Sequence, residues 1–237
     1  MTDASFDLSG RVLYEDNHLI AINKKPSEIV QGDKTGDLPL SEVVKAYLVE
    51  KYQKPGEAFL GVMHRIDRPV SGVVMFAKTS KALTRMNQMM QQKQMNKRYW
   101  AVVRNLPDPA SAALVHYLLK NEKQNKSYIV EAHSPGAKEA SLTYKLLASG
   151  HHYHLLEVDL HTGRHHQIRA QLSFIGSPIR GDLKYGYPRS NGDGSIHLHA
   201  RSVSFTHPVS KEAISLVAPV PYQDAVWACF HDTPDQL

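Results

Sequence analysis

Short strand-like runs dominate this chain and constrain its fold more than any other feature. Several of them alternate apolar and polar residues, the period of a strand that has one face in the core. The most apolar run, GVVMFAK at 72–78, predicts a buried strand. The expected strands are 11–14, 18–23, 72–78, 98–103, 127–132, 139–147, 152–160, 196–205 and 213–219.

Helical patterns are few and do not alternate regularly with the strands. Apolar residues at helical spacing predict helices over 38–52, from Thr79 or Ser80 to about Gln94, over 164–174 and over 224–230. The methionine-rich face of the second helix is interpreted as core packing. This pattern favours an α+β fold with a mixed, largely antiparallel sheet, and we predict a single domain over residues 1–237.

Composition indicates an ordinary globular protein. The chain has 237 residues, 42% hydrophobic and 22% charged, and its formal charge of +5 is spread along the sequence. Such a charge is compatible with a polyanionic partner such as nucleic acid. We find no leader-like N-terminus, no apolar stretch near the ~18 residues of a membrane helix and only one cysteine, Cys229. The expectation is a cytoplasmic monomer that does not bind membranes.

Three segments carry more polar residues than a strand or loop pattern requires. They are HRIDR at 64–68, KRYWA at 97–101 and HTGRHHQIR at 161–169. Each has an ordinary interpretation, because Arg-Asp-Arg loops are commonly surface ion pairs worth under about 1 kcal/mol and His/Arg-rich turns are commonly only turns.

Asp67 is the least ordinary of these residues, because it precedes the most apolar strand, with only residues 68–71 between them. A carboxylate at the end of a buried element is costly to leave unpaired, so it protonates or takes a cation. Arg65 and Arg68 need not supply that cation, since neighbouring side chains in an extended segment point to opposite faces. The sequence therefore predicts a more distant arginine as the partner.

The 14 histidines suggest a metal site as one alternative. Those considered are His151, His152, His154, His161, His165, His166, His197 and His199. Their spacings do not form the HExxH arrangement, and metal sites are recognised by spacing, so we predict no metal. A metal-dependent hydrolase remains a hypothesis that insensitivity to chelators would remove.

The segment HRIDRPVSGVVMFAKTSKAL resembles the catalytic motif of the RluA family of RNA pseudouridine synthases. LYEDNHLIAINKKPSEIV, KRYWAVV, HTGRHHQIRAQLSFIGSPIRGDLKYG and LHARSVSFTHP resemble further blocks of that family, in the same order. Together they cover about residues 11–220, which chance matches of short motifs would not produce. The resemblance implies the pseudouridine-synthase fold and isomerisation of uridines in RNA without a cofactor.

The resemblance also implies roles for individual residues. Asp67 matches the catalytic aspartate, Tyr99 the tyrosine that packs on the base, and Arg169 the basic partner of the aspartate. Arg65 matches the arginine that enters the RNA, and Leu198 an apolar residue against the base. Substrate-binding roles are also expected for His64 and Arg164, whereas Arg68 receives no role.

Substrate choice is less constrained. Val70 and Gln171 depart from the family pattern, and the small RNA-binding domain of many members does not fit in the first 10 residues. Selection then depends on loops expected at 31–38, 104–126 and 185–195, and either tRNA or rRNA is possible. A catalytically silent RNA-binding protein is the alternative, but it should have lost at least one of the three catalytic residues.

Overall fold

The computed structural model describes residues 8–230 and 232–235, which fold into two compact units. The first unit holds the chain up to Met95 and then Arg201–Pro219, and the second holds Asn96–Ala200 and the chain from Val220 onward. The predicted single domain over 1–237 includes the ends of the chain outside the described residues, and it stays a prediction beside this division.

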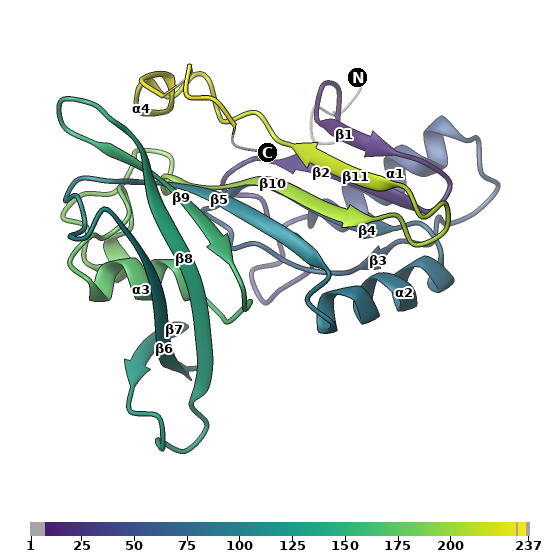
Figure 1. Ribbon diagram of the computed structural model, residues 1–237. Helices are drawn as coiled ribbons and strands as arrows, with labels where there is room; N and C mark the ends of the chain where they lie inside the picture. Colours follow the sequence, from purple (N-terminus) through teal and green to yellow (C-terminus); the bar gives the residue numbers. More distant parts are fainter. Residues whose placement is uncertain (1–7, 231, 236–237) are drawn as a thin grey trace. The chain divides into compact units, whose positions relative to one another are not determined.

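The first unit is built on a sheet in the order β1-β2-β4-β10 (Figure 1). Hydrogen-bonded antiparallel pairing joins β2 to β4, from Leu19 opposite Ala77 to Lys24 opposite Gly72. β3 is added to β4 and β11 to β10. The elements are β1 (Val12–Glu15), β2 (Leu19–Lys24), α1 (Leu40–Lys51), β3 (Gly61–Val62), β4 (Ser71–Ala77), α2 (Ser80–Gln91), β10 (Leu198–Thr206, which begins in the second unit) and β11 (Ala213–Val217).

Burial in the first unit follows the sequence pattern. Every residue of β4 is buried, as its apolar run predicts. The Thr79 side chain accepts a hydrogen bond from the Ala82 amide and so caps α2, and Met86 of α2 is fully buried in the core. The interpretation of the methionine-rich face as core packing is therefore confirmed, since Met89 and Met90 also pack against that core.

The second unit has the strand order β5-β9-β8-β6-β7, and these neighbours are all antiparallel. One core gathers around Trp100, and another joins α3 to the β6–β8 part of the sheet through Ala170, Leu118 and Ala140 (Figure 1). The elements are β5 (Met95–Val103, which begins in the first unit), β6 (Ser111–Asn121), β7 (Lys126–Val130), β8 (Lys138–Ser149), β9 (His154–Leu160), α3 (Gln167–Phe174), the 3-10 helix η2 (Leu183–Tyr185) and α4 (Ala225–Ala228).

The predicted α+β class with a mixed, largely antiparallel sheet is confirmed. The loop expected at 104–126 is wrong, because β6 occupies the middle of it, from Ser111 to Asn121. Apolar side chains lie on the exposed face of β6, Val115 among them at 60% exposure, so the strand lacks the alternation that would have revealed it. In the described part of the chain, no helix combines the length and apolarity that a membrane crossing requires.

Candidate active site

Asp67 lies in the first unit, in the turn that leads into β4. Its backbone carbonyl accepts a hydrogen bond from the Val70 amide at 3.0 Å, which closes a tight turn just before Ser71. Asp67 is half-buried, whereas β4 behind it is buried along its whole length. The turn therefore holds a carboxylate at the end of a buried strand, as the sequence predicts.

Lys24, at the end of β2, fastens this turn from inside. Its ammonium donates to the carbonyls of Lys25 at 2.9 Å, Glu28 at 2.8 Å and Arg68 at 3.1 Å, and the residue is only 1% exposed. Burial lowers the pKa of Lys24 to about 7, although the carboxylates of Glu28 and Asp67 favour its charged form. A buried cation in the same unit thus interacts with Asp67, and sequence reasoning missed it.

Arg68 points to the loop that follows β2. Its guanidinium pairs with Asp37 at 2.6 Å and approaches Asp33 at 3.7 Å, and Nη2 donates to the Thr35 hydroxyl at 2.8 Å. The three partners are exposed, as are all residues of 31–38, which form a loop as expected. The structure thus gives a set of contacts to the arginine for which the motif supplies no role.

Arg65 and His64 occupy the same segment in different ways. Arg65 is exposed. The His64 side chain is half-buried, and its Nε2 accepts a hydrogen bond from the Met75 amide of β4 at 3.1 Å. Because Nε2 acts as an acceptor, the proton of the imidazole ring is on Nδ1. The ring therefore supports the main chain of β4 close to β3.

Three of the predicted residues lie in the second unit, on β5, at the start of β10 and just ahead of α3. Tyr99 is half-buried on β5 opposite Val158, on the other face of the strand from the buried Trp100. Leu198 is buried at the start of β10. Arg164 is exposed ahead of α3, where its Nε donates to the Glu139 carbonyl at 2.8 Å.

Arg169 is fixed from two sides inside the second unit. Its Nε and Nη2 donate to the two carboxylate oxygens of Asp182 at 2.7 and 2.9 Å, and the side chains are 6% and 1% exposed. The guanidinium lies 5.0 Å from the ring centre of Tyr185. This bidentate ion pair, together with the neighbouring aromatic ring, fixes the orientation of the Arg169 guanidinium.

The ring of Tyr185 is itself held in place. Its hydroxyl accepts from the Ser127 amide at 2.9 Å and lies 3.0 Å from Nδ1 of His166. Burial, and after it the charge of Arg169, lowers the pKa of His166 to about 2. His166 is therefore neutral at physiological pH and adds no second charge next to Arg169.

Metal-ligand geometry is not found in the described residues, where no group of three or more His, Cys, Asp or Glu side chains could hold an ion. The histidines instead serve individual contacts. His165 stacks on His166 with ring centres 3.7 Å apart, and His197 pairs with Asp224 at 2.9 Å.

The predicted site residues divide between the two units. The first unit carries Asp67, Arg65 and His64 on one segment, and the second carries Tyr99, Arg164, Arg169 and Leu198. The pairing of Asp67 with Arg169 stays a prediction. Sequence reasoning missed Lys24, Asp182 and Tyr185, although the last two stand in the GDLKYG part of a segment already singled out.

Comparison with known proteins identifies the family of this chain. A family model described as RNA pseudouridylate synthase matches residues 18–174. The ribosomal large subunit pseudouridine synthase C of Yersinia pestis is 32% identical over 222 residues, which are 91% of this chain and 67% of that protein. The enzyme of the same name from Escherichia coli K12 is 31% identical over 221 residues, with 90% and 67% covered.

Solved structures share the fold. Human RNA pseudouridylate synthase domain containing 4 superposes with a TM-score of 0.79 at 24% identity, covering 94% of this chain and 93% of that one. Human RNA pseudouridylate synthase domain containing 1 gives 0.68 at 21% identity, covering 94% and 87%.

The chain belongs to the RNA pseudouridylate synthase family, as its RluA-type motifs indicate. It is an isomerase that converts uridines in RNA to pseudouridine.

Proposed function

We propose that this enzyme modifies large-subunit ribosomal RNA, with Asp67 as the catalytic carboxylate. The observation that carries the proposal is the preformed turn at 67–70, which presents the carboxylate of the HRIDR motif at the end of a buried strand. The relatives from Yersinia pestis and Escherichia coli K12, which match 91% and 90% of this chain, are named as ribosomal large subunit enzymes, and this favours rRNA over tRNA.

The isomerisation requires only one carboxylate as its nucleophile. Asp67 attacks the target nucleotide, and the N1–C1′ bond breaks with its electron pair left on the uracil. The uracil turns, C5 bonds to C1′ as Asp67 departs, the C5 proton is removed, and N1 takes up a proton in its place. Retaining glycosidases cleave similar bonds through a carboxylate, but they must also protonate a leaving group and admit water. Here the leaving group is reused, so the product is an isomer and no cofactor is consumed.

The remaining predicted residues serve the base and its extrusion. Tyr99 packs on the uracil and assists removal of the C5 proton, and Leu198 lies against the base. Arg169, which the ion pair with Asp182 holds in place, is proposed as the cationic partner of Asp67. Taking a base out of its stack costs a few kcal/mol, and the exposed side chain of Arg65 is suited to enter the RNA in its place.

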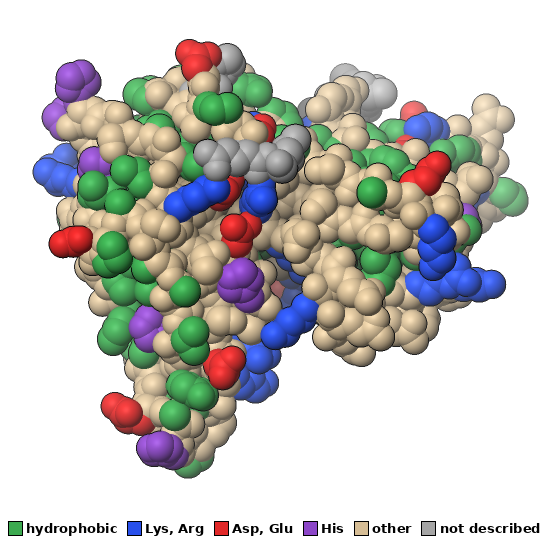
Figure 2. Space-filling model, in the orientation of Figure 1, with side chains coloured by type: hydrophobic (Ala, Val, Ile, Leu, Met, Phe, Trp, Pro, Cys, Tyr) green, Lys and Arg blue, Asp and Glu red, His purple; other side chains and the backbone are tan. Residues whose placement is uncertain are grey.

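Electrostatics favours this class of substrate. The chain carries a formal charge of +5, and Figure 2 shows lysine and arginine side chains distributed over the visible face among acidic ones. Contacts to phosphates from such a surface offset the cost of base extrusion. We further propose that His64 and Arg164 contribute to RNA binding, and that the enzyme acts as a monomer in the cytoplasm.

Mapping of pseudouridine in unmodified large-subunit rRNA and in tRNA, each incubated with the purified protein, tests the proposal. We expect new pseudouridines in the rRNA that are absent when Asp67→Ala protein is used. Modification confined to tRNA would overturn the proposed substrate, and wild-type activity of Asp67→Ala would overturn the proposed nucleophile.

A further inference from the structure

Arg68 combines a fixed backbone with an accessible head group. Its carbonyl accepts hydrogen bonds from the Lys24 ammonium at 3.1 Å and from the Ser27 amide at 2.8 Å. Its side chain is 38% exposed, and it directly follows Asp67. The residue is therefore anchored beside the candidate nucleophile while its guanidinium remains within reach of solvent.

An acidic loop occupies that guanidinium. Asp37 lies 2.6 Å from Nη1, Asp33 lies 3.7 Å from Nη2, and the Thr35 hydroxyl accepts from Nη2 at 2.8 Å. Asp33 in turn accepts from the amide of Thr35 at 2.8 Å and from its hydroxyl. Oxygen atoms from three side chains thus converge on one planar donor group, as the oxygens of a phosphate would.

Both carboxylates are kept ionised. Hydrogen bonds from the Thr35 side chain, assisted by Arg68, lower the pKa of Asp33. The hydrogen bond from Arg68 lowers the pKa of Asp37. Two negative charges therefore stand at Arg68, the residue after Asp67, in a protein whose substrate is a polyanion, and they repel any RNA that approaches without reaching Arg68.

The ion pairs between Arg68 and the two aspartates of the loop are weak enough for another anion to replace them. The side chains of Asp33 and Asp37 are 44% and 56% exposed, and solvent-exposed ion pairs of this kind are weak. A phosphodiester can engage the same guanidinium with two parallel hydrogen bonds, and it brings many further contacts elsewhere in the RNA. Once RNA is bound nearby, its phosphate therefore binds the Arg68 guanidinium in preference to the loop carboxylates.

We propose that Arg68 is a phosphate-binding site for the RNA backbone, and that Asp33 and Asp37 occupy it until substrate displaces them. This inference rests on the proposed role of Asp67, because it places the RNA at this turn. The acidic loop acts as an internal competitor: RNA whose backbone reaches Arg68 replaces the carboxylates, whereas RNA that presents no phosphate there meets their charge.

A double-mutant cycle on RNA binding tests the exchange. Dissociation constants for unmodified large-subunit rRNA are measured across a salt series for wild type, Arg68→Gln, Asp33→Asn/Asp37→Asn, and the three changes combined. We expect Arg68→Gln to weaken binding by about 3–10-fold and to reduce the salt dependence by about one ion, because one phosphate contact is lost. We expect the Asn pair to tighten binding by a similar factor, about 3–10-fold, and to steepen the salt dependence by about one ion.

The double-mutant cycle distinguishes two effects of the loop aspartates: competition with phosphate for Arg68, and general electrostatic repulsion of RNA. If the loop competes for Arg68, the gain from the Asn pair shrinks to less than about 2-fold once Arg68 is Gln, because no binding site remains to be released. An equal gain in both backgrounds would overturn the proposal, as would an Arg68→Gln protein that binds RNA like wild type.

A matched control removes two carboxylates from elsewhere in the same unit. Glu42→Gln/Glu50→Gln changes two exposed residues of α1, one of them paired with Lys45 at 2.9 Å. It should tighten binding clearly less than the loop pair, and an equal effect would also reject the exchange. Pseudouridine formation is scored separately, so failure of the role of Asp67 appears as activity in Asp67→Ala, whatever the binding cycle gives.

Discussion

The two candidate catalytic charges are held in opposite ways. Asp67 stands half-buried on a turn whose main chain is fastened by Val70 and Lys24. Arg169 is buried, its guanidinium gripped by Asp182 and covered by the ring of Tyr185. The turn of Asp67 is fastened through its backbone, and the guanidinium of Arg169 is held by contacts of its side chain.

The difference separates two ways of preorganising a charge. A turn fastened through its main chain fixes the position from which the carboxylate extends, whereas a guanidinium with two charge-assisted bonds already in place loses little entropy when it makes another. Asp182 also balances the charge of Arg169 within its own unit. Variants that disturb each arrangement separately can break or sharpen this comparison.

Asp67→Asn should have the largest effect on the reaction. Loss of the nucleophile is expected to lower the rate of pseudouridine formation by about 10⁴-fold or more. Because Asp67 is half-exposed and its turn is held by main-chain contacts, thermal unfolding should shift by only about 1–2 °C. Single-turnover assays and calorimetry measure the two quantities. A large loss of stability would show that the side chain, and not the backbone, holds the turn.

Arg169→Leu should affect both activity and folding, because it leaves the carboxylate of Asp182 buried without its cation. We expect a loss of about 3–5 kcal/mol in the free energy of unfolding, measured in urea. The double variant Arg169→Met/Asp182→Leu should recover most of that stability and still form no pseudouridine. Full activity of the double variant would contradict any part for Arg169 in the reaction.

Lys24→Met should act on the Asp67 side through the backbone. Removing its donors leaves carbonyls of Lys25, Glu28 and Arg68 unpaired, and about 1–3 kcal/mol of stability should be lost at pH 9. Turnover should fall by about 10-fold with a smaller change in KM, because the turn that carries Asp67 loosens. Unchanged kinetics in a folded variant would assign Lys24 to stability alone.

The pH dependence of stability offers a second test of Lys24. Its pKa is about 7 in the folded protein against 10.5 for an ordinary lysine, so folding releases a proton between these values. Wild-type stability should therefore rise with pH across this window, by at most about 1.4 kcal/mol per unit, and level off below pH 7. Lys24→Met should lack this rise, whereas equal slopes for the two proteins would contradict the burial of a charged lysine.

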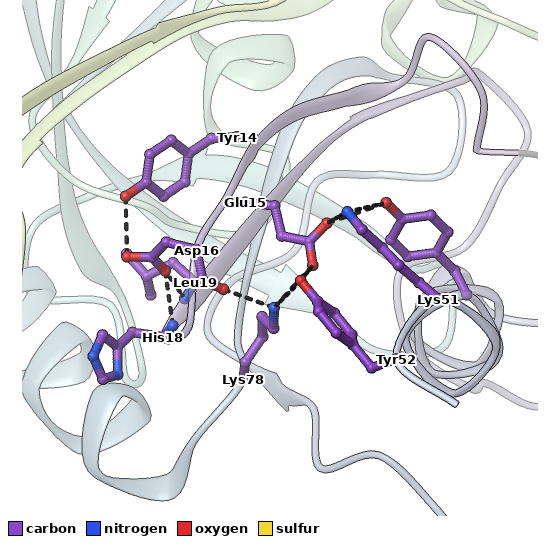
Figure 3. A network of polar contacts seen from close by, with 9 residues as sticks. Tyr14, Glu15, Asp16, His18, Leu19, Lys51, Tyr52 and Lys78 are labelled. Carbon is purple, nitrogen blue, oxygen red and sulfur yellow. Dashed lines mark hydrogen bonds and ion pairs between the residues drawn. The ribbon is translucent and has the colours of Figure 1, made fainter. Parts of the chain in front are cut away.

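Glu15→Gln should have the smallest functional effect, since Glu15 lies at the far end of β4 from Asp67. Figure 3 shows its carboxylate among Lys51, Tyr52 and Lys78, with contacts of 2.7, 2.7 and 2.8 Å. Burial opposes ionisation, but these hydrogen bonds prevail and lower the pKa of Glu15 to about 2. We expect a loss of about 2 kcal/mol at pH 7 and activity within about 2-fold of wild type.

Acid titration checks the same network. A carboxylate with a lowered pKa stabilises the fold fully above its ordinary value of 4.5, and this contribution disappears as pH falls towards 2. Wild type should therefore lose its advantage over Glu15→Gln across that window. A difference between the two proteins that does not change with pH would show that the lost contacts are steric and not electrostatic.

Most of the fold could be read from the sequence, because local signals agreed with the tertiary structure. The apolar run at 72–78 and the Thr79 cap gave β4 and the start of α2 to within a residue or two. β6 is one exception, and the start of α3 is another that has a local cause. That helix begins at Gln167 and not at Arg164, because His166 adopts a left-handed conformation with φ of 53°.

The surroundings of the candidate site were harder to predict, because they depend on which side chains the fold buries. Lysines in a KKP turn are ordinarily exposed, yet Lys24 is 1% exposed beneath the Asp67 turn. The distance along the chain hides Asp182 as well, since 13 residues separate it from Arg169. Motifs located the reacting residues, and only the structure gave the contacts that hold them.

The division of the chain into interleaved units has a consequence for its synthesis. The core of the first unit contains Val203, Phe205 and Leu216, which the ribosome adds only after the whole segment 96–200 has been made. At about 5–20 residues per second, the earlier part of that core waits roughly 5–20 s for its last strands. During this interval the apolar β4 lacks its neighbour β10, so we expect nascent chains to depend on chaperones until Pro219 has left the exit tunnel.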